Sequence, residues 1–209
     1  AALAGHDLLL VFGAPVLRQY PCEPGDLVPD EMTVVQVTPH PDEVHHSIAD
    51  LALVADVAAT AGALAERADA RDAPPGERRA PVAPLPRPEP GEPIRPGHVF
   101  DLLAAGLPAD AILLEESPSS RPELHRRVPA RAPLGFVSAA AGGLGFGLPA
   151  AVGLKLGAPD RPVVAVLGDG SSMYGIQGLW SAARYDAGVL FVVMSNGGYA
   201  IMDRLAERS

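Results

Sequence analysis

The clearest apolar pattern of the chain lies in its C-terminal third. Two apolar runs of strand length, residues 163–167 and 189–194, enclose a segment in which apolar residues recur at helical spacing. The residues at that spacing are Met173, Ile176, Leu179, Trp180 and Ala183. The order of strand, tight turn, helix and strand predicts a βαβ unit of a parallel sheet.

Shorter apolar runs predict the elements of the rest of the chain. Strands are predicted at residues 8–12, 32–37, 51–54 and 111–114, and helices at residues 57–67 and 99–107. Strands that alternate with helices are typical of proteins with a parallel sheet. The predicted fold class is therefore α/β, with parallel sheets flanked by helices.

A proline-rich stretch divides the chain. Residues 69–96 contain nine of the 23 prolines, interspersed with Arg, Glu and Ala. This composition favours extended backbone and indicates a tether between folded segments, with a proline-rich ligand as the alternative. We therefore predict one α/β segment at residues 1–68, an interdomain linker at residues 69–96 and a second α/β segment at residues 97–209.

Polar residues follow both strands of the C-terminal βαβ unit. Asp169 comes just after the first strand and Asn196 just after the second, and both strands must end at the same edge of the sheet. We therefore expect the two side chains to be neighbours where parallel sheets bind ligands. Their oxygens suit Mg²⁺, which often also takes ligands from a phosphate. Gly168 and Gly170 permit a tight turn that presents N–H groups to an anion, so the pattern predicts a metal-bridged phosphate or diphosphate.

Composition narrows the classes of function. A formal net charge of −9 offers no basic patch for nucleic acid or for an anionic membrane. No apolar run reaches the roughly 18 residues of a membrane span. Cys22 is the only cysteine, so no internal disulfide can form, which fits a reducing cytoplasm. His40, His45 and His46 are interpreted as solvated loop and helix-start residues and not as a metal cluster.

Several short motifs surround the predicted βαβ unit. The word G-D-G-S at residues 168–171 places 25 residues between G-D-G and the word N-G-G-Y at residues 196–199. The other words are A-A-G-G-L-G-F at 140–146, L-P-A-A at 148–151, L-W-S-A-A at 179–183 and G-H-D-L-L-L-V-F-G-A-P-V at 5–16. Together they resemble the thiamine diphosphate-dependent 2-oxo acid decarboxylase and acetolactate synthase superfamily, and look most like benzoylformate decarboxylase. One departure is Ser195, which stands where the family usually has the first of two asparagines.

The resemblance implies thiamine diphosphate and Mg²⁺ as cofactors. It places the metal on the side chains of Asp169 and Asn196 and on the carbonyl of Gly198. It places the carbonyl of Gly142 against the aminopyrimidine ring and the side chain of Leu144 beneath the cofactor. Packing alone is a rival explanation for the glycines, because small residues also let a backbone approach its neighbours closely.

The resemblance also places diphosphate contacts after the strand predicted at residues 111–114. They fall at Pro118 and Ser119, although Pro118 offers neither an N–H group nor a hydroxyl. A polar turn that caps a helix explains these residues nearly as well. The full set of implied cofactor-binding residues is Pro118, Ser119, Gly142, Leu144, Gly168, Asp169, Gly170, Ser171, Asn196, Gly198 and Tyr199.

The activity implied by the resemblance is non-oxidative decarboxylation of a small 2-oxo acid to an aldehyde, by a cytoplasmic homodimer or homotetramer. Residues 1–68 would be the C-terminal part of the non-catalytic middle domain, and residues 97–209 the N-terminal part of the diphosphate-binding domain. In the family, the glutamate that activates the cofactor and the groups that move protons lie in sequence that this chain does not contain. Catalytic residues are therefore not assigned, and the chain alone is expected to be inactive.

Two residues after N-G-G-Y match substrate-pocket positions of the resembled enzymes. Ile201 and Leu205 stand where benzoylformate decarboxylase has a small residue and an aromatic one, and Met202 stands where pyruvate decarboxylases have a catalytic glutamate. A branched Ile201 should shrink an aryl pocket, so we expect a tilt towards aliphatic or smaller 2-oxo acids. The same i, i+4 pair would also form the apolar face of a helix.

Three other functions remain open at this point. An acetolactate synthase-like carboligase would share the cofactor and differ in its product. A nicotinamide-binding oxidoreductase domain is suggested by Gly145, Gly147 and Ala150, which fit G-x-G-x-x-A, although no convincing strand precedes them and Pro149 interrupts the motif. A non-catalytic assembly or regulatory module would require no cofactor.

Overall fold

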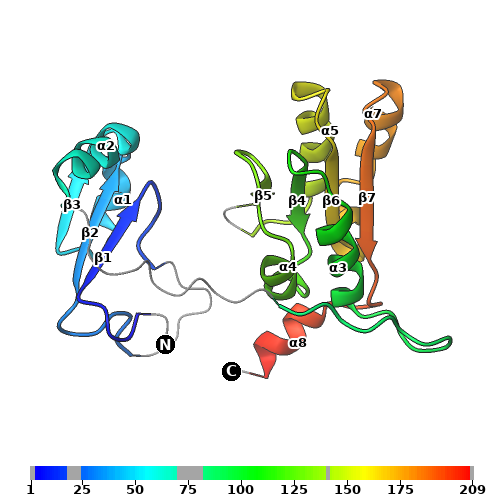
Figure 1. The fold of residues 1–209 in the computed structure, drawn as a ribbon, viewed down its shortest axis with the longest axis horizontal. Helices are drawn as coiled ribbons and strands as arrows, with labels where there is room; N and C mark the ends of the chain where they lie inside the picture. The colour runs from blue at the N-terminus through cyan, green and yellow to red at the C-terminus, as the bar shows by residue number, and fades with distance from the viewer. Residues whose placement is uncertain (1–2, 18–24, 70–81, 140–141, 208–209) are drawn as a thin grey trace. The chain divides into compact units, whose positions relative to one another are not determined.

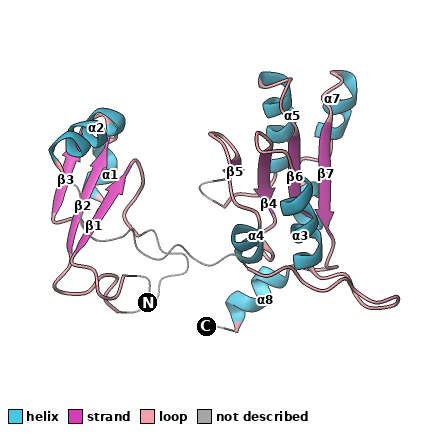
Figure 2. Cartoon of the chain, in the orientation of Figure 1, coloured by secondary structure: helices cyan, strands magenta, loops and turns pink. Residues whose placement is uncertain are grey.

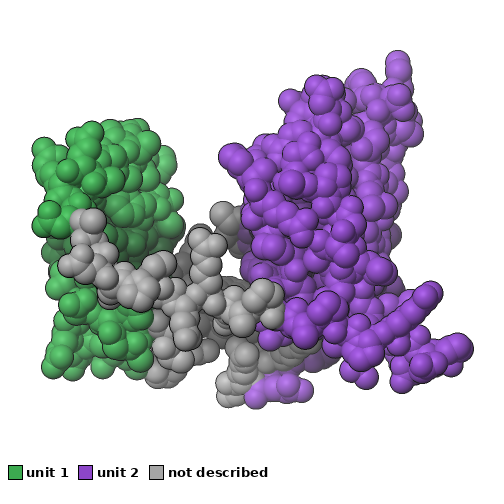
Figure 3. Space-filling model, viewed as in Figure 1, with its two compact units in different colours: residues 1–76 green, residues 77–209 purple. Residues whose placement is uncertain are grey.

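The chain forms two compact units. A computed structural model describes residues 3–17, 25–69, 82–139 and 142–207. The units comprise residues 1–76 and 77–209 (Figure 3). Within the described residues, no helix is long and apolar enough to cross a membrane.

The first unit is a small parallel α/β segment (Figure 1). Its sheet has the order β1-β2-β3, with β1 at Leu8–Phe12, β2 at Thr33–Thr38 and β3 at Leu51–Val54. Helix α1 spans Pro41–His45 and helix α2 spans Val57–Arg67. The carboxylate of Asp56 caps α2 by accepting a hydrogen bond from the N–H of Ala59 at 2.7 Å. The strands and the helix predicted here are confirmed to within a residue.

The second unit is built on a four-stranded parallel sheet of order β5-β4-β6-β7. Its strands are β4 at Ile112–Glu116, β5 at Phe136–Ser138, β6 at Val163–Gly168 and β7 at Val189–Met194. The apolar residues of β6 are buried along the whole strand, as expected where both faces of a parallel sheet are covered. The predicted fold class, parallel sheets flanked by helices, is confirmed (Figure 2).

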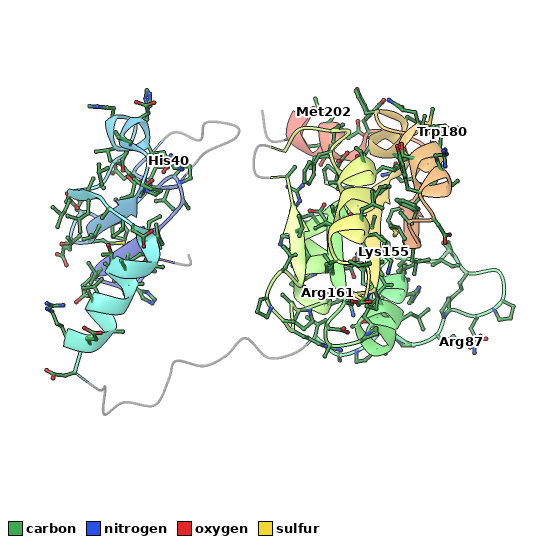
Figure 4. All side chains as sticks on the ribbon, turned by 90° about the horizontal axis from the view of Figure 1, so that it is seen from above. His40, Arg87, Lys155, Arg161, Trp180 and Met202 are labelled. Carbon is green, nitrogen blue, oxygen red and sulfur yellow. The ribbon has the colours of Figure 1, made fainter. Side chains whose placement is uncertain are left out.

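Helices cover both faces of this sheet. Helix α5, at Gly147–Gly157, packs Leu148 and Ala151 against one face, while α3 at Pro96–Gly106 and α4 at Arg121–Arg127 pack Phe100 and Leu124 against the other. Three short helices complete the unit, namely α6 at Asp169–Met173, α7 at Gly178–Arg184 and α8 at Ala200–Ala206. At the start of β6 the ammonium group of Lys155 donates to the carbonyl of Arg161 at 3.0 Å (Figure 4).

The helical stripe predicted between β6 and β7 is broken into two helices. The turn after α6 and the first residue of α7 pack close to α5. A Cβ on Gly175 would lie 3.0 Å from Cδ of Pro149, and one on Gly178 would lie 2.5 Å from Cδ2 of Leu148. Most of the apolar stripe is instead exposed, and Trp180, 67% exposed, lies on the outer side of α7 (Figure 4).

Part of the predicted linker packs against the second unit. The N–H of Leu85 donates to the carboxylate of Asp101 on α3 at 2.7 Å, and the guanidinium of Arg127 on α4 donates to the carbonyl of Ala83 at 3.3 Å. Residues 70–81 of the predicted linker lie outside the described residues. The domain boundaries proposed from the sequence at residues 68 and 97 stay predictions.

Candidate functional site

The carboxyl edge of the second sheet contains a topological switch point. From β4 the chain runs through α4 to β5 on one side, and from β5 it crosses through α5 to β6 on the other side of β4. Ligands of open α/β sheets bind in the crevice that such a reversal creates. A pocket lies there, lined by Ser117, Pro118, Ser119, Ser120, Leu144, Gly168, Asp169, Gly170, Ser171, Met194, Asn196, Gly198, Tyr199 and Ile201.

Asp169 and Asn196 are neighbours in this pocket, as the two adjacent strand ends predicted. The carboxylate oxygen Oδ2 of Asp169 accepts hydrogen bonds from the N–H of Asn196 at 3.3 Å and from the N–H of Gly197 at 3.2 Å. The hydroxyl of Ser195 donates to the same oxygen at 3.2 Å. The residue that departs from the usual family motif therefore supports the carboxylate instead of competing with it.

The charge of the Asp169 carboxylate is stabilised by its surroundings. Its pKa is lowered, first by the hydrogen bond from the N–H of Gly170, which lies 2.8 Å from Oδ1, against an opposing contribution from burial. The N–H of Gly197, the hydroxyl of Ser195 and the N–H of Asn196 lower the pKa further. Asp169 is thus an anionic oxygen donor at neutral pH, as a hard cation requires.

The glycines of the pocket are used for close approach. A Cβ on Gly170 would lie 3.1 Å from Cε1 of Tyr199, and one on Gly168 would lie 3.3 Å from Oγ of Ser171. Side chains at these positions would fill the space beside Asp169. The chain therefore keeps its backbone accessible where the sequence analysis predicted an anion.

The residues of the pocket suit a diphosphate bridged by Mg²⁺. Oδ1 of Asn196, which accepts from the N–H of Gly198 at 3.1 Å, adds an amide oxygen beside the carboxylate of Asp169. Ser117 lines the same pocket, and its buried hydroxyl has no hydrogen-bond partner within the described residues. A buried hydroxyl without a partner is costly unless a ligand or water satisfies it. Both the oxygen donors and this hydroxyl fit the cofactor that the motifs imply.

Most of the predicted cofactor-binding residues meet in one place. The pocket lining contains Pro118, Ser119, Leu144, Gly168, Asp169, Gly170, Ser171, Asn196, Gly198 and Tyr199. Gly142 lies on the loop before Leu144, with a positive φ of 69°, but it is not part of the lining. Of the two predicted substrate-pocket residues, Ile201 lines the pocket, whereas the side chain of Leu205 lies outside the described residues.

Two buried carboxylates at the end of β4 were missed from the sequence. Glu115 is fully buried and accepts hydrogen bonds from the N–H of Ser117 at 2.6 Å, from Nε of Arg121 at 2.8 Å and from the hydroxyl of Ser138 at 3.0 Å. Glu116 is 2% exposed and points to the other face of the sheet. The sequence signal for these residues was that Glu115 and Glu116 follow the apolar run directly, with no turn residue between the run and the two acids.

The glycine-rich loop is held by Glu116. The carboxylate accepts a hydrogen bond from the N–H of Gly145 at 2.7 Å and another from the N–H of Gly147, where α5 begins. In a nicotinamide-binding fold these N–H groups would be available to a pyrophosphate. Here the protein's own carboxylate occupies them, which disfavours that alternative. The expectation that no strand precedes these glycines is wrong, however, because strand β5 lies before the loop.

The fold and this pocket define a class of protein, a parallel α/β domain that presents carboxylate, amide and hydroxyl groups at a switch point suited to a metal-bound diphosphate. Sequence comparison agrees, since residues 120–208 match the family described as thiamine pyrophosphate enzyme, C-terminal TPP binding domain. Residues 120–208 are therefore similar to the cofactor-binding domain of that family. The resemblance to thiamine diphosphate-dependent decarboxylases and acetolactate synthases is confirmed, and thiamine diphosphate is the cofactor that the family description names.

Individual relatives extend the similarity to nearly the whole chain. Benzoylformate decarboxylase of Pseudomonas aeruginosa is 46% identical over 204 residues, which are 96% of this chain and 38% of that protein. A putative acetolactate synthase large subunit of Mycobacterium tuberculosis is 36% identical over 206 residues, which are 97% of this chain and 36% of that protein. The chain thus spans less than two fifths of the length of these relatives.

Solved structures agree with this assignment. The structure of benzoylformate decarboxylase from Polynucleobacter necessarius is 33% identical, with a TM-score of 0.91, and the match covers 99% of this chain and 39% of that one. The thiamine diphosphate-dependent 4-hydroxybenzoylformate decarboxylase of Rhodococcus jostii is 37% identical, with a TM-score of 0.86 and the same two coverages.

Proposed function

We propose that the protein to which these residues belong catalyses the non-oxidative decarboxylation of a 2-oxo acid to an aldehyde, with thiamine diphosphate and Mg²⁺. This chain would supply the half of the active site that anchors the cofactor. The observation that carries the proposal is the pairing of an ionised Asp169 with Asn196 in the pocket at the switch point. The similarity to benzoylformate decarboxylase supports the reaction class.

The residues of the pocket would divide the work of binding. Asp169, Asn196 and the carbonyl of Gly198 would hold Mg²⁺, while Ser119 and the N–H groups of the turn at 168–171 would contact the diphosphate. The hydroxyl of Ser117 has the position and the unused hydrogen-bonding capacity to help. When bound, thiamine diphosphate supplies the electron sink that makes loss of CO₂ possible. The role of the chain is to orient that cofactor and to exclude water.

The activity of the isolated chain, the oligomeric state and the cellular compartment are also proposed. In the resembled enzymes the activating glutamate comes from another domain, so we expect the 209-residue chain alone to be inactive. We propose a homodimer or homotetramer in the cytoplasm. Sedimentation of the full-length protein and assays of the isolated chain test these points. Decarboxylation by the isolated chain would contradict the first of them.

The substrate is proposed to be an aliphatic or small 2-oxo acid, because Ile201 lines the pocket and its branched side chain should leave less room than a small residue would. Replacing Ile201 by alanine in the full-length enzyme should raise kcat/KM for benzoylformate, relative to a branched aliphatic 2-oxo acid, by about 10-fold. The matched control is Leu156→Ala, since Leu156 on α5 is also aliphatic, is 51% exposed and does not line the pocket. A strong preference of the unaltered enzyme for benzoylformate would contradict the proposal.

A carboligase remains the second candidate, because the similarity to an acetolactate synthase large subunit covers 97% of this chain. Both reactions begin with loss of CO₂ from a 2-oxo acid and differ in what is added next. Product analysis separates the two: the decarboxylase releases an aldehyde, whereas the carboligase releases an acetohydroxy acid or an acyloin. A protein that binds no thiamine diphosphate in its full-length form would instead favour an assembly or regulatory role.

A further inference from the structure

Glu116 links two parts of the second unit that are far apart in sequence. It is the last residue of β4, in the interior of the sheet between β5 and β6, and its side chain is 2% exposed. One carboxylate oxygen accepts from the N–H of Gly145 at 2.7 Å and the other from the N–H of Gly147. These donors precede and begin α5, a helix of 11 residues whose positive end also stabilises the carboxylate.

This part of the glycine-rich loop packs too closely against its neighbours to accommodate a side chain. A Cβ on Gly147 would lie 2.7 Å from Cδ2 of Leu167 and 2.9 Å from Cβ of Glu116. Gly145 has a positive φ of 94°, and a Cβ there would lie 2.8 Å from Cβ of Tyr174. The backbone at 145–147 therefore packs closely against β4, β6 and the turn after α6, and the carboxylate of Glu116 holds its N–H groups in place.

The fixed segment adjoins the residue that enters the pocket. Leu144, 38% exposed, lines the pocket and directly precedes Gly145. The neighbouring Glu115 makes none of these contacts, because it points to the opposite face of the sheet and binds Ser117, Arg121 and Ser138. The two adjacent carboxylates therefore hold different parts of the crevice.

We infer that Glu116 is a positioning residue. Its carboxylate holds the loop of residues 142–147 so that Leu144, and Gly142 before it, face the organic part of the bound cofactor, while the Asp169 and Asn196 pair that takes the metal and diphosphate is left unchanged. The inference rests on the proposed function, since it assigns the loop to the same cofactor. It predicts that loss of Glu116 affects the two halves of the cofactor unequally.

The test compares two ligands in the full-length enzyme. Glu116→Gln keeps the volume of the side chain but turns an NH₂ group towards one of the two N–H donors. By calorimetry, the affinity for thiamine diphosphate with Mg²⁺ should fall about 10- to 100-fold. The affinity for Mg²⁺ with inorganic pyrophosphate should stay within about twofold. Amide hydrogen exchange at Gly145 and Gly147, measured without any ligand, should become faster.

Controls separate the loop from the fold. Glu115→Gln removes a charge of equal burial from the same strand and should leave amide exchange at Gly145 and Gly147 unchanged. Glu116→Asp, which keeps both acceptor oxygens, should recover part of the lost affinity and takes the place of Glu116→Gln if that variant does not fold. Leu144→Ala should weaken binding of thiamine diphosphate but not of pyrophosphate, and its effect should not add to that of Glu116→Gln.

Two results would overturn the inference. One is an unchanged affinity of the folded Glu116→Gln variant for thiamine diphosphate. The other is an equal loss of affinity for thiamine diphosphate and for pyrophosphate, which would make Glu116 a general structural residue. Failure of the unaltered enzyme to bind thiamine diphosphate would instead refute the proposed function, so the two failures are distinguishable.

Discussion

Replacement of Asp169 by alanine in the full-length enzyme is expected to abolish Mg²⁺-dependent binding of thiamine diphosphate. The variant loses the only carboxylate among the described residues that line the pocket, and it leaves the N–H groups of Asn196 and Gly197 without their acceptor. A metal that prefers anionic oxygen would then have only neutral donors. Calorimetry in the presence of Mg²⁺ should show a loss of at least roughly 100-fold in affinity, the equivalent of about 2.7 kcal/mol.

The chain offers a matched control for this substitution. Asp160 is exposed in the connection between α5 and β6, at the opposite edge of the sheet from the pocket. Asp160→Ala removes the same charge from the same unit and should leave the affinity for thiamine diphosphate unchanged. An Asp169→Ala enzyme that binds the cofactor as tightly as the Asp160→Ala enzyme would show that the metal site lies elsewhere.

The second large effect concerns stability and the end of the proline-rich stretch. Asp101 and Arg127 form an ion pair of 2.7 Å with side chains only 15% and 7% exposed, and Asp101 also accepts from the N–H of Leu85. Asp101→Asn should destabilise the second unit by about 1–3 kcal/mol, because it leaves a buried guanidinium and a buried N–H without a charged acceptor. Thermal unfolding of the full-length protein measures the loss, and amide exchange at Leu85 locates it.

The pH dependence of this effect has a definite sign. Burial by itself would raise the pKa of Asp101, but the N–H of Leu85 and the guanidinium of Arg127 outweigh it, and the pKa is lowered from 3.8. A carboxylate with a lowered pKa stabilises the fold at every pH above its unfolded value and loses that contribution as pH falls through the folded value. The difference between the unaltered enzyme and Asp101→Asn should thus be constant above about pH 5 and should shrink progressively as the pH falls through 3.8 and below.

A graded comparison completes this test. Arg127 also pairs with Glu123 at 3.0 Å, but the side chain of Glu123 is 30% exposed, so water screens that contact. Glu123→Gln should cost less than 1 kcal/mol, on the order of an exposed i, i+4 pair. Equal effects of Asp101→Asn and Glu123→Gln would show that the proline-rich segment is not held by Asp101.

Strands were predicted best where their buried residues are all apolar and consecutive in the sequence. Strand β6 was evident because Val163 to Leu167 are apolar and covered on both faces. Strand β4 was cut short at residue 114, because Glu115 and Glu116 look like surface residues although both are buried inside the strand. Their carboxylates are satisfied by donors up to 31 residues away, a condition that no local pattern contains.

The prediction of helices was limited in the same way, because a local pattern does not contain contacts with distant parts of the chain. Apolar spacing indicated one helix between β6 and β7, but two helices, α6 and α7, form there, and Gly175 and Gly178 lie in close contact with α5. Tertiary packing thus overrode a local period. Strand β5 has only three residues, which are too few for a period to appear. It was therefore not predicted, and the glycine-rich loop was wrongly expected to have no strand before it.

The residues of the candidate site also differ in whether a local sequence pattern could predict their role. The proximity of Asp169 and Asn196 followed from the sequence, because adjacent parallel strands end at one edge whatever the rest of the fold does. The contribution of Glu116 could not follow, since it depends on the order of the strands and on the return of the chain through α5 to the far side of β4. Asp169 and Asn196, which belong to one βαβ unit, could therefore be predicted. Glu116 could not, because its role depends on the order of all the strands in the sheet.

Release of CO₂ from a 2-oxo acid by the full-length protein tests most directly whether it is a thiamine diphosphate-dependent decarboxylase. The protein, freed of bound ligands by chelation and dialysis, would be given a set of aryl and branched aliphatic 2-oxo acids, and both CO₂ and the organic product would be measured. We expect CO₂ and the matching aldehyde only when thiamine diphosphate and Mg²⁺ are both added, and no product from the Asp169→Ala enzyme. Release of CO₂ without thiamine diphosphate, or none from any 2-oxo acid with both cofactors present, would contradict this expectation.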